Sequence, residues 1–139
     1  MSERISFTVP LTPPGVNHYV KHTRTGRHYT TGEAGAFKDA VAIYAKGQYV
    51  QAKRFTVNIQ VQFAKGQKGD VDGFPKLVMD GLADCGVFRD KQGKRVSDAH
   101  VKRMCVEILD RERTEQGWTW IEVEAQAAFR VKAETYGHR

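Results

Sequence analysis

Gly69-Asp70-Val71-Asp72-Gly73-Phe74-Pro75-Lys76-Leu77-Val78-Met79-Asp80 is the stretch where the residue pattern changes from that of a strand to that of a helix. Just upstream, apolar and polar residues alternate from Phe55 to Phe63, which is the period of a half-buried strand. Pro75 suits the first turn of a helix, where its missing N–H removes no intrahelical bond. We therefore predict a strand over about 54–63 and a helix that starts with Asp72 at or near the N-cap.

On this helix, Asp72, Lys76 and Asp80 follow one another at i, i+4 and i+8 along one polar stripe. With Asp70 just before the helix, two acids and a lysine face one side, an arrangement that suits a hard divalent cation and a phosphate. A purely structural alternative stays open, because aspartates commonly cap helices and Lys76 can serve as an i,i+4 partner. The opposite face is apolar and comprises Phe74, Leu77, Val78, Gly81, Leu82 and Cys85.

The composition indicates one globular domain, because 139 residues of which 40% are hydrophobic can bury a core without disulfide or metal cross-links. Lysine and arginine number 22 against 16 acids, and this net charge of +6 favours a polyanionic partner. Cys85 and Cys105 fit no metal spacing, so we expect two reduced core thiols. We expect a soluble cytoplasmic protein without a membrane partner, because no leader or long apolar run is present.

The remaining elements follow from the same kinds of pattern, and together they predict an α+β fold. We expect a small mixed sheet with two helices on one face, in the order β-α-β-α-β-β. A single domain would then fill 1–139, with a basic tail over about 130–139. The expected segments are a strand over 5–9, a helix over 32–49 after a Thr30–Glu33 capping box, a second helix ended by Gly86, and strands over 99–109 and 118–125 joined by a hairpin at 112–117.

We expect residues 16–29 to form a long loop or hairpin, in which basic side chains are interleaved with tyrosines and acids are absent. Such a surface fits a phosphate backbone with stackable bases, although a solvated loop without a partner is the simpler alternative. A second basic segment runs from Arg89 to Arg103 and carries six lysines or arginines against two acids, Asp90 and Asp98. Acids at the centre of a basic surface repel DNA unless a cation bridges them. The pattern therefore predicts a metal-dependent nuclease.

Three stretches resemble the RusA family of phage-type Holliday junction resolvases. The first two are the proline-rich segment 10–17 ending in Asn17 and the basic tyrosine-bearing stretch after it. The third is Asp70 to Lys76 with Asp80 and Leu82, which is similar to the family's DxDNxxK…DxL core. The resemblance implies a homodimeric endonuclease that needs Mg²⁺, for which Mn²⁺ can substitute. It would make paired symmetric nicks in branched, four-way DNA. It also implies a bacterial host cell and a phage or prophage origin.

Carried over by position, the resemblance makes Asp70 and Asp72 catalytic metal ligands and Lys76 a catalytic or phosphate-contacting residue. The family has a pair of acids after the second helix, whereas here Asp90 precedes Lys91 and residues 92–95 look like an insertion before Asp98. Either acid could complete the metal site. We favour Asp90 as the third catalytic metal ligand, because it follows the helix at the family's distance. Gly73 replaces the family's usual asparagine.

The DNA-binding residues that we predict lie in both basic segments. The competing hypothesis is a branched-DNA-binding protein whose metal site is degraded and which does not cleave. Only the enzyme would require a metal and Asp72 for cleavage. The predicted DNA-binding residues are Asn17, Tyr19, Lys21, Arg24, Arg27, Lys68, Lys91, Lys94 and Arg95.

Overall fold

The computed structural model describes residues 3–14, 20–22, 28–30, 32–67, 73–110 and 115–126. Its main sheet has four strands in the order β1-β8-β5-β7. β5 pairs antiparallel with β8 and parallel with β7, so the sheet is mixed, and the predicted α+β class is confirmed. The strands are β1 (Arg4–Val9), β5 (Phe55–Gln62), β7 (Val101–Ile108) and β8 (Trp118–Ala125).

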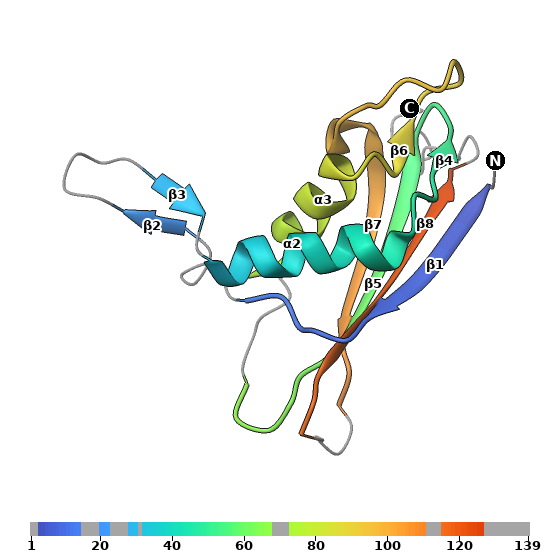
Figure 1. Ribbon diagram of the computed structural model, residues 1–139. Coiled ribbons are helices and arrows are strands. Elements are labelled where there is room, and N and C mark those ends of the chain that lie inside the picture. The colour runs from blue at the N-terminus through green and yellow to red at the C-terminus, as the bar shows by residue number, and fades with distance from the viewer. Residues whose placement is uncertain are drawn as a thin grey trace, which may run out of the picture.

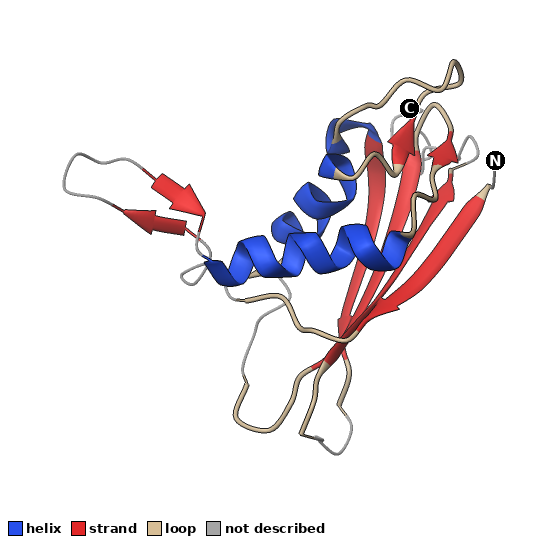
Figure 2. Ribbon diagram, in the orientation of Figure 1, coloured by secondary structure: helices blue, strands red, loops and turns tan. Residues whose placement is uncertain are grey.

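Two helices, α2 (Gly32–Ala45) and α3 (Pro75–Asp84), pack against each other and cover one face of this sheet (Figures 1 and 2). Alternate strand residues point to that face, among them Val57, Ile59 and Ile121, and all three are buried. A Cβ on Gly81 would lie 3.4 Å from the Cβ of Val41, so the glycine allows the helices to approach closely. The core therefore lies between the sheet and the helix pair.

Several shorter elements lie outside the main sheet and the helix pair. β2 (Val20–His22) and β3 (His28–Thr30) form an antiparallel hairpin that Figure 1 shows apart from the main sheet. β4 (Val50–Gln51) pairs in parallel with β6 (Phe88–Arg89) just after α3. A short 3₁₀ helix, η1 (Asp98–His100), leads directly into β7. Within the described residues, no helix is long and apolar enough to cross a membrane.

Both helices begin or end differently from the prediction. α2 ends at Ala45 and not near Tyr49, because Lys46 (φ 54°) and Gly47 (φ 72°) adopt the left-handed conformation that terminates helices. α3 has Phe74 as its N-cap without a side-chain cap hydrogen bond, so Asp72, which we placed at or near the N-cap, is not the cap itself and precedes it by two residues. Pro75 does open the helix, and Gly86 (φ 78°) follows its end, as expected.

The predicted hairpin between the last two strands is also wrong. β5 lies between β7 and β8, which therefore are not neighbours. Strands adjacent in sequence usually pair, but here the strand with the longest buried run takes the central position, where both of its edges are covered. Residues 111–114 of the connection lie outside the described part.

We predicted two core cysteines, and one of the two is not in the core. Cys85 is half-buried, and burial raises the pKa of its thiol. Cys105 is exposed on β7. It pairs in register with Asn58, which lies on the sheet face opposite to Val57 and Ile59. The helices cover only the Val57 and Ile59 face, so Cys105 is not a core residue.

Candidate active site

Lys76 stands in the first turn of α3 and joins two acids from different parts of the chain. Its Nζ donates a hydrogen bond to Oδ2 of Asp98 at 2.9 Å and forms an ion pair with Oδ1 of Asp80 at 3.1 Å. Asp80 is one helical turn further on, whereas Asp98 opens η1. Ser97 caps η1 by accepting a hydrogen bond from the backbone N–H of Ala99, which fixes the backbone at Asp98.

These contacts determine the charge state of Lys76. Hydrogen bonds to Asp98 and then Asp80 raise the pKa of its ammonium above the ordinary 10.5, because both acids stabilise the charged form. The lysine side chain is 64% exposed, so a phosphate can approach it. Two carboxylates within 3.1 Å stabilise the charged form of Lys76, and this geometry suits a role as a fixed positive charge.

Asp90 has a different kind of environment. Its Oδ1 accepts hydrogen bonds from the backbone N–H groups of Gln92 and Lys94, each at 2.9 Å. Its own N–H donates to the carbonyl of Lys94 at 2.8 Å. Asp90 thus stabilises a turn in the way that aspartates commonly do. The turn closes a small hairpin, in which an isolated antiparallel β-bridge pairs the backbones of Arg89 and Arg95. The carboxylate of Asp90 therefore stabilises the turn that it begins.

This hairpin is attached to the C-terminal end of α3. Nη1 of Arg95 donates to the carbonyl of Asp84 at 3.4 Å, and Nε of Arg89 donates to the carbonyl of Gly86 at 3.1 Å. Lys76 and Asp84 are separated by about 12 Å along the helix at 1.5 Å per residue. The structure thus brings Asp98 to the N-terminal end of α3, beside Lys76. It places the hairpin of Asp90 at the C-terminal end of the same helix.

A groove of about 340 Å³ runs between α3 and β7 next to the Lys76–Asp98 pair. Lys102 contributes positive charge to its lining, and Nζ of Lys102 donates to the carbonyl of Ala99 at 2.8 Å. Arg103 also lines the groove, but it pairs in register with Thr56, on the same sheet face as Cys105. Our sequence-based set of DNA contacts omitted both residues, although they belong to the basic run that starts at Arg89. The lining residues are Pro75, Lys76, Met79, Asp98, Val101, Lys102, Arg103 and Met104.

The structure describes the other predicted site residues to different extents. Lys91 and Lys94 are exposed on the hairpin, and Arg95 is exposed but bonded to α3. Lys21 is described only through its backbone in β2. In the described ranges, no three His, Cys, Asp or Glu side chains are grouped so that they could hold a metal. Outside those ranges, and therefore still predictions, are Asn17, Tyr19, Arg24, Arg27, Lys68, Asp70 and Asp72.

A carboxylate held beside a cationic side chain, in a groove lined with lysine and arginine, is suited to an enzyme that cleaves phosphodiesters. The sequence model of the family described as Endodeoxyribonuclease RusA matches residues 10–124. The chain belongs to this family, so the protein is an endodeoxyribonuclease and the predicted resemblance is confirmed. No curated protein sequence matches the chain.

Proposed function

We propose that the protein resolves four-way DNA junctions by paired symmetric nicks that depend on a divalent metal, Mg²⁺ or in its place Mn²⁺. The observation that carries this proposal is the Lys76–Asp98 contact inside the part of the chain that matches the family. Two symmetric nicks need two active sites related by a two-fold axis, so we propose a homodimer. The family points to the cytoplasm of a bacterial host and a phage or prophage origin.

For the metal ligands we propose Asp70, Asp72 and Asp98. Asp72 is two residues before Phe74, so at most about 7 Å of chain separates it from the start of α3. Phe74 is itself held by an edge-on contact with the ring of Phe63, whose centroid lies 6.0 Å away. Asp98 is on the same end of α3, and its side chain is only 26% exposed. Carboxylate oxygens of this kind are the donors that Mg²⁺ prefers.

We propose Asp98 in place of Asp90, which the sequence alone had favoured. Two backbone N–H groups already bond one oxygen of Asp90, and its hairpin joins the far end of α3. The length of that hairpin agrees with an insertion that moves the family's second acid from the position after the helix to the start of η1. Asp90 would then support the turn and take no part in cleavage.

A bound metal would polarise the scissile phosphodiester and lower the pKa of the attacking water. Lys76 would add a fixed positive charge where negative charge grows on the phosphate in the transition state. The ammonium of Lys76 contacts both Asp98 and Asp80 and offsets part of their negative charge, which lowers the repulsion between these two carboxylates. Lys102 would hold the DNA backbone in the groove between α3 and β7.

The test uses a labelled immobile four-way junction and a linear duplex of matched length, each incubated in Mg²⁺, Mn²⁺ or EDTA. We expect paired nicks in the junction alone, and only with metal. Asp72→Asn should abolish cleavage and preserve binding, since it removes negative charge near the phosphate. Asp39→Asn, an exposed change on α2, is the control and should cleave normally.

Two results would count against the proposal. Cleavage by Asp72→Asn at the rate of the unmodified protein would contradict the metal site. Tight junction binding without cleavage in either metal would replace the proposal with the function of a branched-DNA-binding protein.

A further inference from the structure

β7 lies at one edge of the main sheet and pairs with β5 on its inner side. Among the residues that the structure describes, no strand pairs with its outer side, and Figure 1 shows it as the outermost strand on the side away from β1. The four consecutive residues from Lys102 to Cys105 are exposed, and Met104 is 44% exposed. An exposed edge strand of this kind is a template for pairing with another chain.

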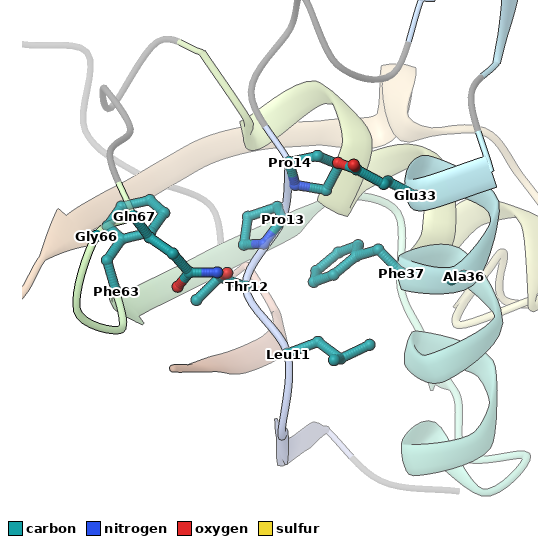
Figure 3. A pocket seen from close by; sticks show the side chains of 10 residues that line it. All are labelled: Leu11, Thr12, Pro13, Pro14, Glu33, Ala36, Phe37, Phe63, Gly66 and Gln67. Carbon is teal, nitrogen blue, oxygen red and sulfur yellow. The ribbon is translucent and has the colours of Figure 1, made fainter. Parts of the chain in front are cut away.

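The opposite edge of the sheet is less suited to pairing. β1 is followed directly by Pro10, which has no N–H to donate to a neighbouring strand. The hydroxyl of Thr119 donates to the carbonyl of Leu11 at 2.8 Å and so holds the chain where it leaves the sheet. Figure 3 shows the next part of this segment beside α2, with the ring of Phe37 pointing toward Pro13. The edge of β7 is therefore the better template.

The backbone of β7 presents regular hydrogen-bonding groups at this free edge. β7 forms an uninterrupted ladder with β5 over residues 103–108. The N–H of Leu109, just beyond the ladder, donates to a carbonyl of β5 at 2.8 Å. Because N–H groups of successive strand residues point to opposite edges, that of Cys105 also points toward β5. Those of Met104 and Val106 point to the free edge, where they can bond a second strand.

A two-fold axis perpendicular to the sheet could pair β7 antiparallel with the β7 of a second copy. Residues opposite each other must then lie on the same face of the sheet, so one residue must lie opposite its own copy. With Cys105 at the axis, Met104 lies opposite the partner's Val106, and these two residues can exchange both backbone hydrogen bonds. On the other face of the sheet, Arg103 lies opposite the partner's Glu107.

The charges of β7 are self-complementary in this register. Arg103 and Glu107 are exposed and lie on the sheet face that the helices leave uncovered. Oε1 of Glu107 accepts a hydrogen bond from Nε2 of Gln60 at 3.0 Å, and this bond uses one of its two oxygens. Oppositely charged residues that face each other across two strands stabilise their pairing. An axis at Met104 or at Val106 would instead place both charges opposite uncharged residues.

We propose that two copies of the chain associate through the free edges of β7, in antiparallel pairing about a two-fold axis at Cys105. The inference rests on the proposed function, which calls for a homodimer, and it adds the surface through which the dimer forms. Both Lys76–Asp98 contacts would lie on one face of the joined sheet. The two copies of Val101, which lines the groove beside this contact, would be about 26 Å apart along the strands. Two sites on one face suit two nicks in one junction.

Cross-linking tests the position of the axis. Cys105 would face the partner's Cys105 in a non-hydrogen-bonded pair, where Cα atoms are about 4.5 Å apart and a disulfide can form. Cys85→Ala leaves Cys105 as the single thiol of the chain. Treated with diamide in the absence of DNA, it should give a covalent dimer that dithiothreitol reverses. The control combines Cys85→Ala, Cys105→Ser and Ala42→Cys, carries an exposed thiol on α2, and should not cross-link.

Charge reversal tests the register of the pairing. Each of Arg103→Glu and Glu107→Arg places two pairs of like charges across the axis, so each should raise the Kd of the dimer about tenfold or more. The double variant restores opposite charges and should recover most of the lost affinity. Lys91→Glu makes the same change of charge at an exposed position outside β7 and should dimerise normally. Sedimentation velocity without DNA measures each Kd.

Three results would overturn the proposal: a dimer that neither cross-links through Cys105 nor responds to the charge reversals, single variants that weaken the dimer without recovery in the double variant, and a monomer that cleaves junctions. Assays with the four-way junction in Mg²⁺ separate these results from the proposed function. Paired nicks by a dimer that forms elsewhere would overturn the β7 interface and leave junction resolution intact. Cross-linking and recovery without cleavage in any metal would support the interface and contradict junction resolution.

Discussion

Nζ of Lys76 lies 2.9 Å from Oδ2 of Asp98, although 22 residues separate them in the chain. The contact ties the first turn of α3 to the short 3₁₀ helix that precedes β7. It fixes a positive charge next to an acid at one end of the groove between α3 and β7. The same contact distinguishes Asp98 from Asp90, whose carboxylate closes a turn at the other end of α3.

The stability of this pair should depend on pH in a defined direction. The pKa of Lys76 is raised in the folded state, so its stabilisation is complete below the ordinary pKa of 10.5 and is lost as pH rises through the folded value. Because the pair is exposed, we expect at most about 1 kcal/mol. Urea unfolding of the unmodified protein and Lys76→Met should show a difference at neutral pH that shrinks above 10.5. A difference that grows with pH would contradict the assigned pairing.

Two glycine substitutions should change stability in opposite directions. In Gly117→Ala the new methyl group would lie 2.6 Å from the carbonyl oxygen of Gln62, and we expect a loss of roughly 1–3 kcal/mol from this overpacking. Gly35 lies within α2, and a Cβ there would meet nothing within 4 Å, so Gly35→Ala should add roughly 0.5–1 kcal/mol. Denaturant unfolding measures both. A neutral Gly117→Ala would mean that the backbone of Gly117 does not approach the carbonyl oxygen of Gln62 this closely.

The exposed lysines of the hairpin should contribute to DNA affinity through charge alone. Replacing Lys91 and Lys94 with alanine should weaken junction and duplex binding to the same degree. It should also reduce the slope of log affinity against log salt by roughly 0.9 for each phosphate that the protein no longer neutralises. Binding titrations over a series of salt concentrations measure this slope. An unchanged slope would show that the hairpin does not touch DNA.

Much of the fold could be predicted because local patterns agree with the tertiary structure. The alternation in β5, Pro75 at the start of α3 and Gly86 after its end each reflect local backbone chemistry. The position of β8 beside β1 and β5 could not be derived in this way. β8 pairs on one side with β1 and on the other with β5, both far away in sequence, and the residue pattern within β8 does not specify these neighbours.

The candidate active site could also be predicted only in part. Lys76 and its i,i+4 partner Asp80 follow from helix periodicity, and their ion pair is present. The contact between Asp98 and Lys76 could not be predicted in this way. It depends on how the hairpin after α3 returns the chain toward the start of that helix, and the sequence pattern does not give the shape of this hairpin. One local signal was available, because an aspartate three residues before Gly93 (φ 86°) is typical of a turn. That signal would have marked Asp90 as a turn residue.

The most direct test compares Asp98→Asn with Asp90→Asn for cleavage of a four-way junction in Mg²⁺, with junction binding measured in parallel in EDTA. Asp98→Asn should lower the cleavage rate at least roughly 100-fold while binding is retained, because it removes a charge that stabilises the reacting centre. Asp90→Asn should cleave normally, since an amide oxygen can still accept both backbone hydrogen bonds of the turn. Loss of cleavage in Asp90→Asn together with normal cleavage in Asp98→Asn would contradict the proposed active site.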